Sequence, residues 1–198
     1  MADLILASSS TIRAELLRRA GVDIEIVPAR VDEQAIKDAL VLDGAPARDI
    51  ADALAEAKAA KIGRKHPDKL VLGCDQVLEF DGRLLSKPES PTEAIETLTA
   101  MAGQRHSLFS AAVIQEDGRA VWRHVGVARL WMREASENWI TDYVARNWES
   151  IQHSVGAYKL EEEGVRLFSR IEGDHFNILG MPLLEILSYL TLKGTLPQ

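Results

Sequence analysis

The chain has 198 residues, of which 46% are apolar and 27% charged, and its net charge is −7. These values are typical of a globular protein with a sizeable core, and they exclude an intrinsically disordered chain. The acidic balance disfavours binding to a polynucleotide, which depends on clustered Lys and Arg, although a local basic pocket can still hold a small anion. Cys74 is the one cysteine, which excludes an intramolecular disulfide and a zinc site made of several thiolates.

The first ten residues, MADLILASSS, contain an acid at Asp3 and only a short apolar run. A signal peptide has a basic start and a longer apolar stretch. No segment approaches the ~18 apolar residues of a membrane helix. We therefore expect a cytoplasmic protein that binds no membrane, and the length favours one domain over residues 1–198.

The hydrophobic pattern of the first half alternates between strands and helices. Continuous apolar runs predict buried strands, helical spacing of Leu, Ile and Ala predicts helices, and Gly or Pro mark their ends. In chain order we predict a strand at 4–7, a helix at 11–20, a weak strand at 24–28, a loop with a short helix at 30–46, a helix at 47–65 and a central strand at 70–74 that ends at Asp75.

The second half adds two hairpins to this alternation. Asp-Gly turns between apolar runs are strong hairpin signals, and Pro favours the first turn of a helix. We predict a hairpin at 77–85, a helix at 91–101, a hairpin at 106–131, a helix at 135–148, a strand at 165–171 and a closing helix at 179–192. This order predicts an α/β fold with a mixed sheet rather than a purely parallel one.

A Ser-rich turn between the first strand and the first helix is a candidate phosphate site. Ser8, Ser9, Ser10 and Thr11 are followed by Arg13. A helix start presents free N–H groups and the positive end of the helix dipole, so hydroxyls and an arginine there form a plausible anion cradle. The alternative is a helix capped by Ser10 or Thr11, with exposed serines beside it.

Asp75 follows the predicted central strand, at an edge where open α/β sheets bind ligands. A carboxylate at this place could coordinate Mg²⁺ together with substrate phosphates, or act as a general base on water. A turn or cap aspartate is an equally good interpretation of the pattern. Cys74, in an apolar strand, is expected to be an inert packing residue.

Isolated charged residues add weaker candidates. Lys58, Lys87 and His106 are each more often solvated than functional when judged singly. The acid pair Asp32-Glu33 could bind a metal, although such pairs are usually just exposed. The run from Glu161 to Glu163 has the composition of a solvated acidic turn.

Taken in order, short motifs along the chain resemble those of the Maf-like nucleoside triphosphate pyrophosphatases. The motifs are LILASSSTIRAELL from Leu4, VDE at 31–33, LAEAKA at 54–59, GCDQV at 73–77, SKP at 86–88, GQRH at 103–106, GAYKLEE at 156–162 and NILGMPL at 177–183. They cover essentially the whole chain, and eight motifs in one order are very specific.

This resemblance implies a fold and an activity. The implied fold is a mixed twisted sheet with helices on both sides and two lobes around a nucleotide cleft, similar to that of inosine-triphosphate pyrophosphatases. The implied reaction is hydrolysis of a nucleoside triphosphate between the α and β phosphates, with Mg²⁺ or Mn²⁺ as cofactor. The resemblance also implies a homodimer and a house-cleaning role against modified nucleotides.

Motif matching carries the family's functional residues onto this chain. It implies that Asp75 is the catalytic carboxylate and that Glu33 is a second acid near the phosphates, both as metal ligands. It implies catalytic and phosphate-binding roles for Lys58 and Lys87. Further residues are expected to contact the substrate, and they are Ser8, Ser10, Arg13, Gln76 and Glu161.

Gln76 and Glu161 resemble the 7-methyl-GTP branch of the family more than the dTTP/UTP branch. A carboxylate suits the N–H donors of a guanine edge. Ile12 departs from both branches, because it offers neither a second arginine nor an aromatic ring. We therefore favour 7-methyl-GTP and keep three alternatives: a dTTP/UTP pyrophosphatase, a nucleotide-binding regulator of cell division or septum formation with weak or no hydrolysis, and an interaction domain without a small ligand.

Overall fold

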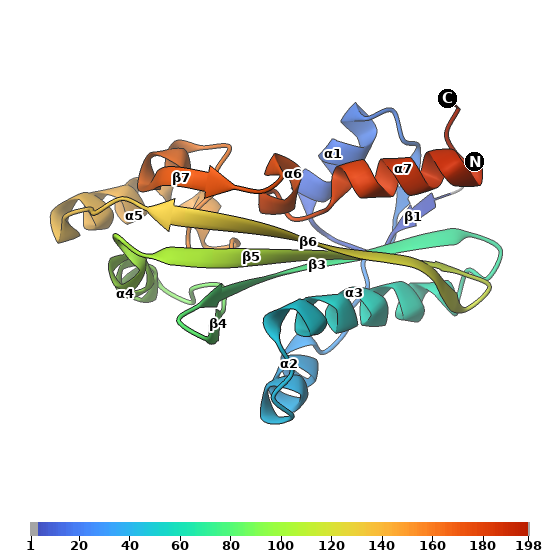
Figure 1. The fold of residues 1–198 in the computed structure, drawn as a ribbon, viewed down its shortest axis with the longest axis horizontal. Helices are drawn as coiled ribbons and strands as arrows, with labels where there is room; N and C mark the ends of the chain where they lie inside the picture. Colours follow the sequence, from blue (N-terminus) through green and yellow to red (C-terminus); the bar gives the residue numbers. More distant parts are fainter. Residues whose placement is uncertain (1–3, 198) are drawn as a thin grey trace. The chain divides into compact units, whose positions relative to one another are not determined.

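The computed structural model describes residues 4–197, and Figure 1 shows the order of the elements along the chain. The strands are β1 (Leu4–Leu6), β2 (Ile24–Ile26), β3 (Leu70–Phe80), β4 (Arg83–Leu85), β5 (Arg105–Glu116), β6 (Arg119–Met132) and β7 (Phe168–Glu172). Over the described residues these seven strands form one sheet in the order β2-β1-β3-β5-β6-β7, with β4 paired to β3. Both parallel and antiparallel pairs occur, which confirms the predicted mixed sheet.

The helices alternate with these strands, which confirms the predicted α/β class. They are α1 (Thr11–Arg19), α2 (Glu33–Leu42), α3 (Ala47–Gly63), α4 (Pro91–Met101), α5 (Glu137–Ile151), the 3₁₀ helix η1 (Glu163–Leu167), α6 (His175–Ile178) and α7 (Leu183–Lys193). None of the helices in the described part of the chain is long and apolar enough to cross a lipid bilayer.

The chain divides into two compact units. Among the described residues, unit 1 comprises 4–76, 109–126 and 180–197, and unit 2 comprises 77–108 and 127–179. Strands β3, β5 and β6 each contribute residues to both units.

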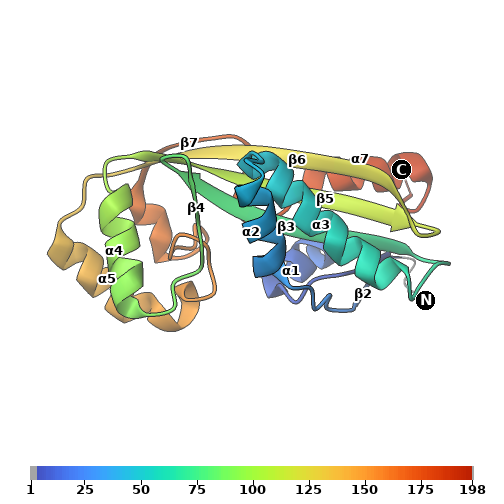
Figure 2. The ribbon, with the colours of Figure 1, turned by 90° about the horizontal axis from the view of Figure 1, so that it is seen from below.

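Unit 1 is built around the parallel pairing of β1 with β2 and β3. All three residues of β1 are buried, as expected for a strand covered on both faces. In this unit, α1 and α7 lie on one face of the sheet and α3 on the other (Figures 1 and 2). Small residues let α3 approach β3 closely: a Cβ placed on Gly73 would collide with the carbonyl oxygen of Ala55 and lie 2.7 Å from the backbone nitrogen of Ala59.

Unit 2 has its own apolar core, which α4 and α5 close from one side. These two helices are in contact and lie next to each other in Figure 2. Their buried residues include Leu98, Met101 and Tyr143, packed in one cluster with Leu78 of β3 and Leu130 of β6. Burial of such side chains is the main stabilising contribution to a unit of this kind.

The elements with strong local signals are where the sequence predicts them. Helix α4 spans the predicted 91–101, with Pro91 in its first turn and a hydrogen bond from the Glu93 amide to the Ser90 hydroxyl. Both predicted hairpin turns are present. Asp81 and Asp117 have a φ of 50°, and the glycines after them also have positive φ, which is the geometry of a type I′ turn.

The end of the central strand was predicted wrongly. Strand β3 does not end at Asp75 but continues to Phe80. The physical reason is that Val77 and Leu78 are buried as well, and the strand goes on to pair with β4 through Leu78–Phe80. It is β1 that ends here, so Asp75 lies within a strand, just beyond the end of its shorter neighbour.

Two elements near the end of the chain also differ from the prediction. Residues 165–167 belong to the 3₁₀ helix η1, and the strand begins only at Phe168. A Cβ on Gly164 would collide with the backbone of Lys159, so this glycine allows a close turn there. The predicted helix over 179–192 begins only at Leu183, as α7, because Gly180 has a φ of 107° and Pro182 follows it. The short helix α6 before it was not predicted.

Candidate active site

The loop after β1 leaves the sheet where β3 continues. Leu6 of β1 pairs with Leu72 of β3, and the Ala7 amide donates a last hydrogen bond of 2.8 Å to the Leu72 carbonyl. From there the chain turns into Ser8 and helix α1. A parallel strand that ends beside a longer neighbour opens the sheet at its carboxyl end, which is where ligands bind in open α/β sheets.

Arg13 ties three distant segments together at this opening. Its Nε donates to the Gly180 carbonyl at 2.8 Å, and its Nη1 donates to the Cys74 carbonyl at 3.0 Å and to Ser8 Oγ at 3.4 Å. Ser8 Oγ also accepts from the Ser10 amide at 3.2 Å. The predicted phosphate ligand Arg13 therefore uses part of its guanidinium to hold the loop, β3 and the segment before α7.

Replacing Arg13 by Lys is expected to lower the free energy of unfolding by about 2 kcal/mol, because one ammonium cannot reach all the acceptors that the planar fork of guanidinium donors reaches. Chemical denaturation measures this loss. Arg18→Lys is the matched control, since Arg18 lies on the same helix and is exposed. Equal stability of the two variants would contradict the structural role of Arg13.

The start of α1 keeps its amide groups available. Ser10 occupies the predicted cap position, but its side chain makes no capping hydrogen bond. The first N–H groups of a helix have no partner within the helix. Together with the buried Ser8 hydroxyl, these donors retain the features of the anion cradle predicted from the sequence.

Lys58 lies on the buried face of α3 and contacts two carboxylates. Its Nζ is 2.5 Å from Asp75 Oδ1 and 2.9 Å from Glu33 Oε1. The exposed fractions of Lys58 and Asp75 are 7% and 5%, so the solvated lysine that the sequence alone favours is wrong. A buried ammonium needs such partners, because an unpaired charge inside a protein is strongly unfavourable.

The two acidic residues at the start of α2, Asp32 and Glu33, make different contacts. The Asp32 carboxylate accepts a hydrogen bond of 3.0 Å from the Ala35 amide and caps the helix. Glu33, the next residue, turns to Lys58. Asp32 thus caps the helix, whereas Glu33 contacts Lys58. The sequence pattern does not reveal this difference.

Asp75 and Glu33 are suitable ligands for a divalent cation. Their carboxylates converge on one cationic group, the Lys58 ammonium. Within residues 4–197 no group of three or more His, Cys, Asp or Glu side chains could hold a metal ion by itself. Two carboxylates completed by substrate phosphates and water are an arrangement that Mg²⁺ prefers, so these residues fit the implied cofactor.

Two neighbours of Asp75 are fixed on either side of it in β3. Gln76 Nε2 donates to Ser110 Oγ of β5 at 3.0 Å, so its amide has a defined orientation. The Cys74 thiol is fully buried, and this burial raises its pKa to about 11. The thiol is therefore neutral near pH 7, which supports the predicted packing role rather than that of a nucleophile.

Lys87 and Glu161 belong to unit 2, whereas the residues described above belong to unit 1. Lys87 is exposed in the segment between β4 and α4, and Glu161 is exposed in the turn before η1. Among residues 4–197, Glu161 makes no hydrogen bond or ion pair with another protein group. The predicted substrate roles of these two residues remain predictions.

The acidic turn is only partly the solvated segment that was predicted. Glu162 Oε1 accepts from the Ser150 hydroxyl at 2.9 Å. Glu163 accepts from Arg146 at 2.9 Å and from Asn147 at 2.8 Å, and these hydrogen bonds lower the pKa of Glu163 to about 2. Two of the three glutamates therefore hold the turn to α5, and Glu161 is left without such a contact.

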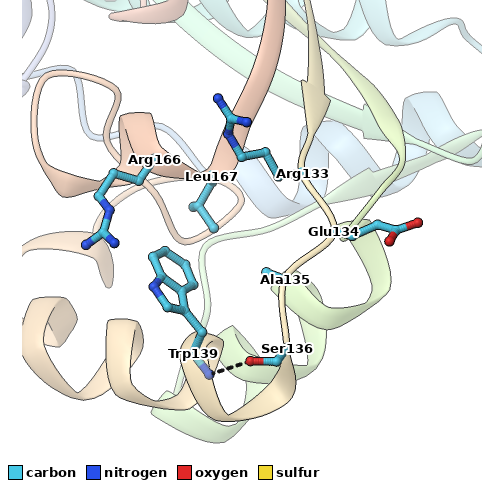
Figure 3. Close-up of a pocket in the computed structure, with 7 residues that line it drawn as sticks. All are labelled: Arg133, Glu134, Ala135, Ser136, Trp139, Arg166 and Leu167. Atoms are coloured by element: carbon cyan, nitrogen blue, oxygen red, sulfur yellow. Dashed lines mark hydrogen bonds between the residues drawn. The ribbon is translucent and has the colours of Figure 1, made fainter.

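Unit 2 also has an open pocket of about 500 Å³, shown in Figure 3. Its lining contains none of the residues predicted for the site; it consists of Arg133, Glu134, Ala135, Ser136, Trp139, Arg166 and Leu167. The Arg166 guanidinium lies 5.3 Å from the centre of the Trp139 ring, and Figure 3 shows the Glu134 carboxylate turned away from this pair. No sequence motif marks this pocket.

The α/β sheet, the open helix start and the buried Lys58–Asp75 pair are features expected of a protein that binds a phosphorylated ligand. The chain belongs to the Maf-like protein family, whose model matches residues 3–192. This confirms the resemblance of the motifs.

Relatives in several bacteria match over nearly their whole length. A nucleoside triphosphate pyrophosphatase of Ruegeria pomeroyi is 63% identical, over 98% of this chain and 97% of the relative. One of Roseobacter denitrificans is 60% identical over 98% of each chain. A protein of Mesorhizobium japonicum named 7-methyl-GTP pyrophosphatase is 44% identical over 98% of this chain and 97% of its own length.

Proposed function

We propose that this protein is a nucleoside triphosphate pyrophosphatase that hydrolyses the bond between the α and β phosphates. The observation that carries the proposal is the buried pair Asp75 and Lys58, which the partly exposed Glu33 joins, beside the open start of α1. A carboxylate can act on water there, and cations and amide groups can hold a polyanion. The names of the close relatives support the same activity.

In the proposed reaction, water attacks the α-phosphorus. Asp75 accepts a proton from this water, the new bond joins the water oxygen to phosphorus, and the bond to the bridging oxygen of the β-phosphate breaks. The products are a nucleoside monophosphate and pyrophosphate. The Ser8 loop and the first amides of α1 hold phosphate oxygens, while Lys58 balances negative charge, because phosphoryl transfer depends on positioning and electrostatic stabilisation.

A divalent ion, Mg²⁺ or Mn²⁺, is held in this proposal by Asp75 and Glu33 together with the substrate. When bound, it supplies charge neutralisation and polarises phosphate oxygens. Pyrophosphate release should therefore stop when the ion is chelated and return when it is restored.

The activity is tested by measuring pyrophosphate and monophosphate release with Mg²⁺ from 7-methyl-GTP, GTP, dTTP, UTP and CTP. Release of both products supports the proposal. Release of inorganic phosphate alone, or no turnover of any substrate, would reject it. Lys87 is proposed to contribute to phosphate binding, and Lys87→Gln should then raise the KM in this assay.

Among these substrates we propose a preference for 7-methyl-GTP. Gln76 has a fixed amide, and Glu161 is exposed and has no protein partner in the described chain. A carboxylate accepts hydrogen bonds from the N–H donors of a guanine edge and attracts a cationic, methylated base, whereas a pyrimidine edge also needs a donor.

Glu161→Gln is expected to reduce the ratio of kcat/KM for 7-methyl-GTP to that for UTP by about tenfold or more, because a charge-assisted hydrogen bond contributes about 1.5–3 kcal/mol. Steady-state kinetics with both substrates measures this ratio. Glu149→Gln, on the exposed side of α5, makes the same charge change and should leave the ratio as it is. An unchanged ratio in Glu161→Gln would refute the selection of the base by Glu161.

A homodimer and a cytoplasmic location belong to the same proposal, supported by the family resemblance. Sedimentation at several protein concentrations tests the homodimer, and fractionation of cells tests the location.

A further inference from the structure

His106 and Tyr158 form a buried polar pair within unit 2. His106, which the sequence suggested to be solvated, is 2% exposed, and Tyr158 is 5% exposed. The His106 Nε2 and the Tyr158 hydroxyl are 2.7 Å apart. Phe168 packs edge-on against Tyr158, with ring centres 4.8 Å apart. The pair therefore joins the GQRH motif to the GAYKLEE motif, and the proposed chemistry uses neither residue of the pair.

The pair stands next to a strained stretch of backbone. Gly156 and Ala157 both have positive φ, at 78° and 58°. This region is unfavourable for alanine, so the surrounding structure must hold it. A Cβ on Gly156 would lie 2.6 Å from a Leu78 methyl carbon, so the chain is pressed against the core just before Tyr158. The hydrogen bond of Tyr158 to His106 fixes the segment directly after this strain.

The other end of the same segment is held as well. Lys159 Nζ donates to Ser150 Oγ at 2.7 Å, Gly164 packs against the backbone of Lys159, and Glu163 pairs with Arg146. Glu161 lies between these anchors and is exposed. The segment 156–163 is thus held at both ends. Within residues 4–197, Glu161 is the acid of this segment whose side chain makes no hydrogen bond or ion pair with the protein.

We propose that His106 is a positioning residue for the nucleotide base: through its hydrogen bond to Tyr158 it fixes the segment 156–163 and so the place of Glu161. The inference rests on the proposed function, because it assigns His106 and Tyr158 to the selection of the base by Glu161. Neither residue needs to touch the substrate.

The chemistry of the pair fits a neutral hydrogen bond. Burial lowers the pKa of His106 to about 4, so its imidazole is uncharged near pH 7. The other ring nitrogen, Nδ1, is buried and has no partner among the described residues. Among the described residues, Tyr158 is therefore the one hydrogen-bond partner of the His106 side chain.

Tyr158→Phe tests the inference, because it removes one hydroxyl and keeps the ring that packs against Phe168. We expect the KM for 7-methyl-GTP to rise about fivefold, the effect of one net hydrogen bond, with little change in kcat. The preference for 7-methyl-GTP over UTP should fall in the same direction as in Glu161→Gln. Amide hydrogen exchange should become faster within the segment 156–163.

Tyr143→Phe is the matched control. Tyr143 is another buried tyrosine of the same core, and its hydroxyl has no hydrogen-bond partner within residues 4–197. Its removal should leave the KM and the base preference unchanged. In addition, His106→Phe combined with Tyr158→Phe should affect the base preference less than the sum of the two single changes, because both remove the same interaction.

The outcomes separate the inference from the function on which it rests. If Glu161→Gln changes the base preference but Tyr158→Phe lowers only the thermal stability, the pair is merely structural and the inference is wrong. If Glu161→Gln changes nothing, selection by Glu161 fails and the inference fails with it. If the wild-type protein releases no pyrophosphate, the proposed function itself is rejected, and so is a role for His106 in it.

Discussion

Replacing Asp75 by Asn is expected to reduce pyrophosphate release by about 10³-fold, within the usual contribution of a general base. The amide keeps the shape of the carboxylate but cannot accept a proton from water and is a poor metal ligand. The fold should survive, because Lys58 retains its contact with Glu33 at 2.9 Å and is not left as an isolated buried charge. The measurement is kcat for 7-methyl-GTP with saturating Mg²⁺.

The control for this variant lies on α3. Asp52 is also a carboxylate in a salt bridge, 2.5 Å from Arg123, so Asp52→Asn removes a comparable charge away from the cluster. Its kcat should match that of the wild type. Full turnover by Asp75→Asn would contradict the proposed mechanism, whereas loss of activity in both variants would indicate a general effect of lost ion pairs.

Gly73→Ala is expected to lower the free energy of unfolding by about 3 kcal/mol or more, the upper range for overpacking a core. The added methyl group collides with backbone atoms of α3, the Ala55 carbonyl and the Ala59 amide, and backbone cannot move aside as the end of a side chain can. Since α3 carries Lys58, displacement of this helix should also weaken catalysis. Thermal denaturation should show a decrease of about 10 °C in Tm.

Gly63→Ala provides the comparison on the same helix. Its new methyl group would meet the end of a flexible side chain, Gln115 Oε1, at 2.9 Å. Alanine also favours a helix over glycine by up to about 1 kcal/mol, so we expect a stability close to that of the wild type. If Gly73→Ala proves equally stable, the close packing of α3 on β3 does not constrain position 73.

Local signals explain which parts of the fold were predictable. The Ser90 cap and Pro91 define the start of α4, and the turn at Asp81 defines a hairpin, because each feature acts within a few residues. The later start of α7 was missed for the opposite reason. The apolar spacing begins at Leu179 but the helix starts only at Leu183. The turn before it depends on Gly180, whose carbonyl accepts from Arg13, 167 residues away.

In the candidate site, too, the sequence indicated some residues, whereas contacts between distant residues appear only in the folded chain. The motif resemblance pointed to Asp75, Glu33 and Lys58, and the structure brings these three together. Reasoning from residue types alone left Lys58 in solvent, because an alanine-rich helix does not reveal which polar residue faces the sheet. The burial of His106 was hidden for a similar reason: its partner Tyr158 lies 52 residues further along the chain. Only the folded chain shows which distant groups share a contact.

Unit 1 is made of three separate segments of the chain, and this has a consequence for folding during protein synthesis. This unit includes residues that follow 179, whereas both segments of unit 2 come before them. Because a ribosome delivers the chain from its N-terminus, unit 2 can begin to fold before the contact between Arg13 and Gly180 exists. The loop around Ser8 should therefore acquire its final geometry late, and a ribosome-bound chain stalled before Gly180 emerges should have no pyrophosphatase activity.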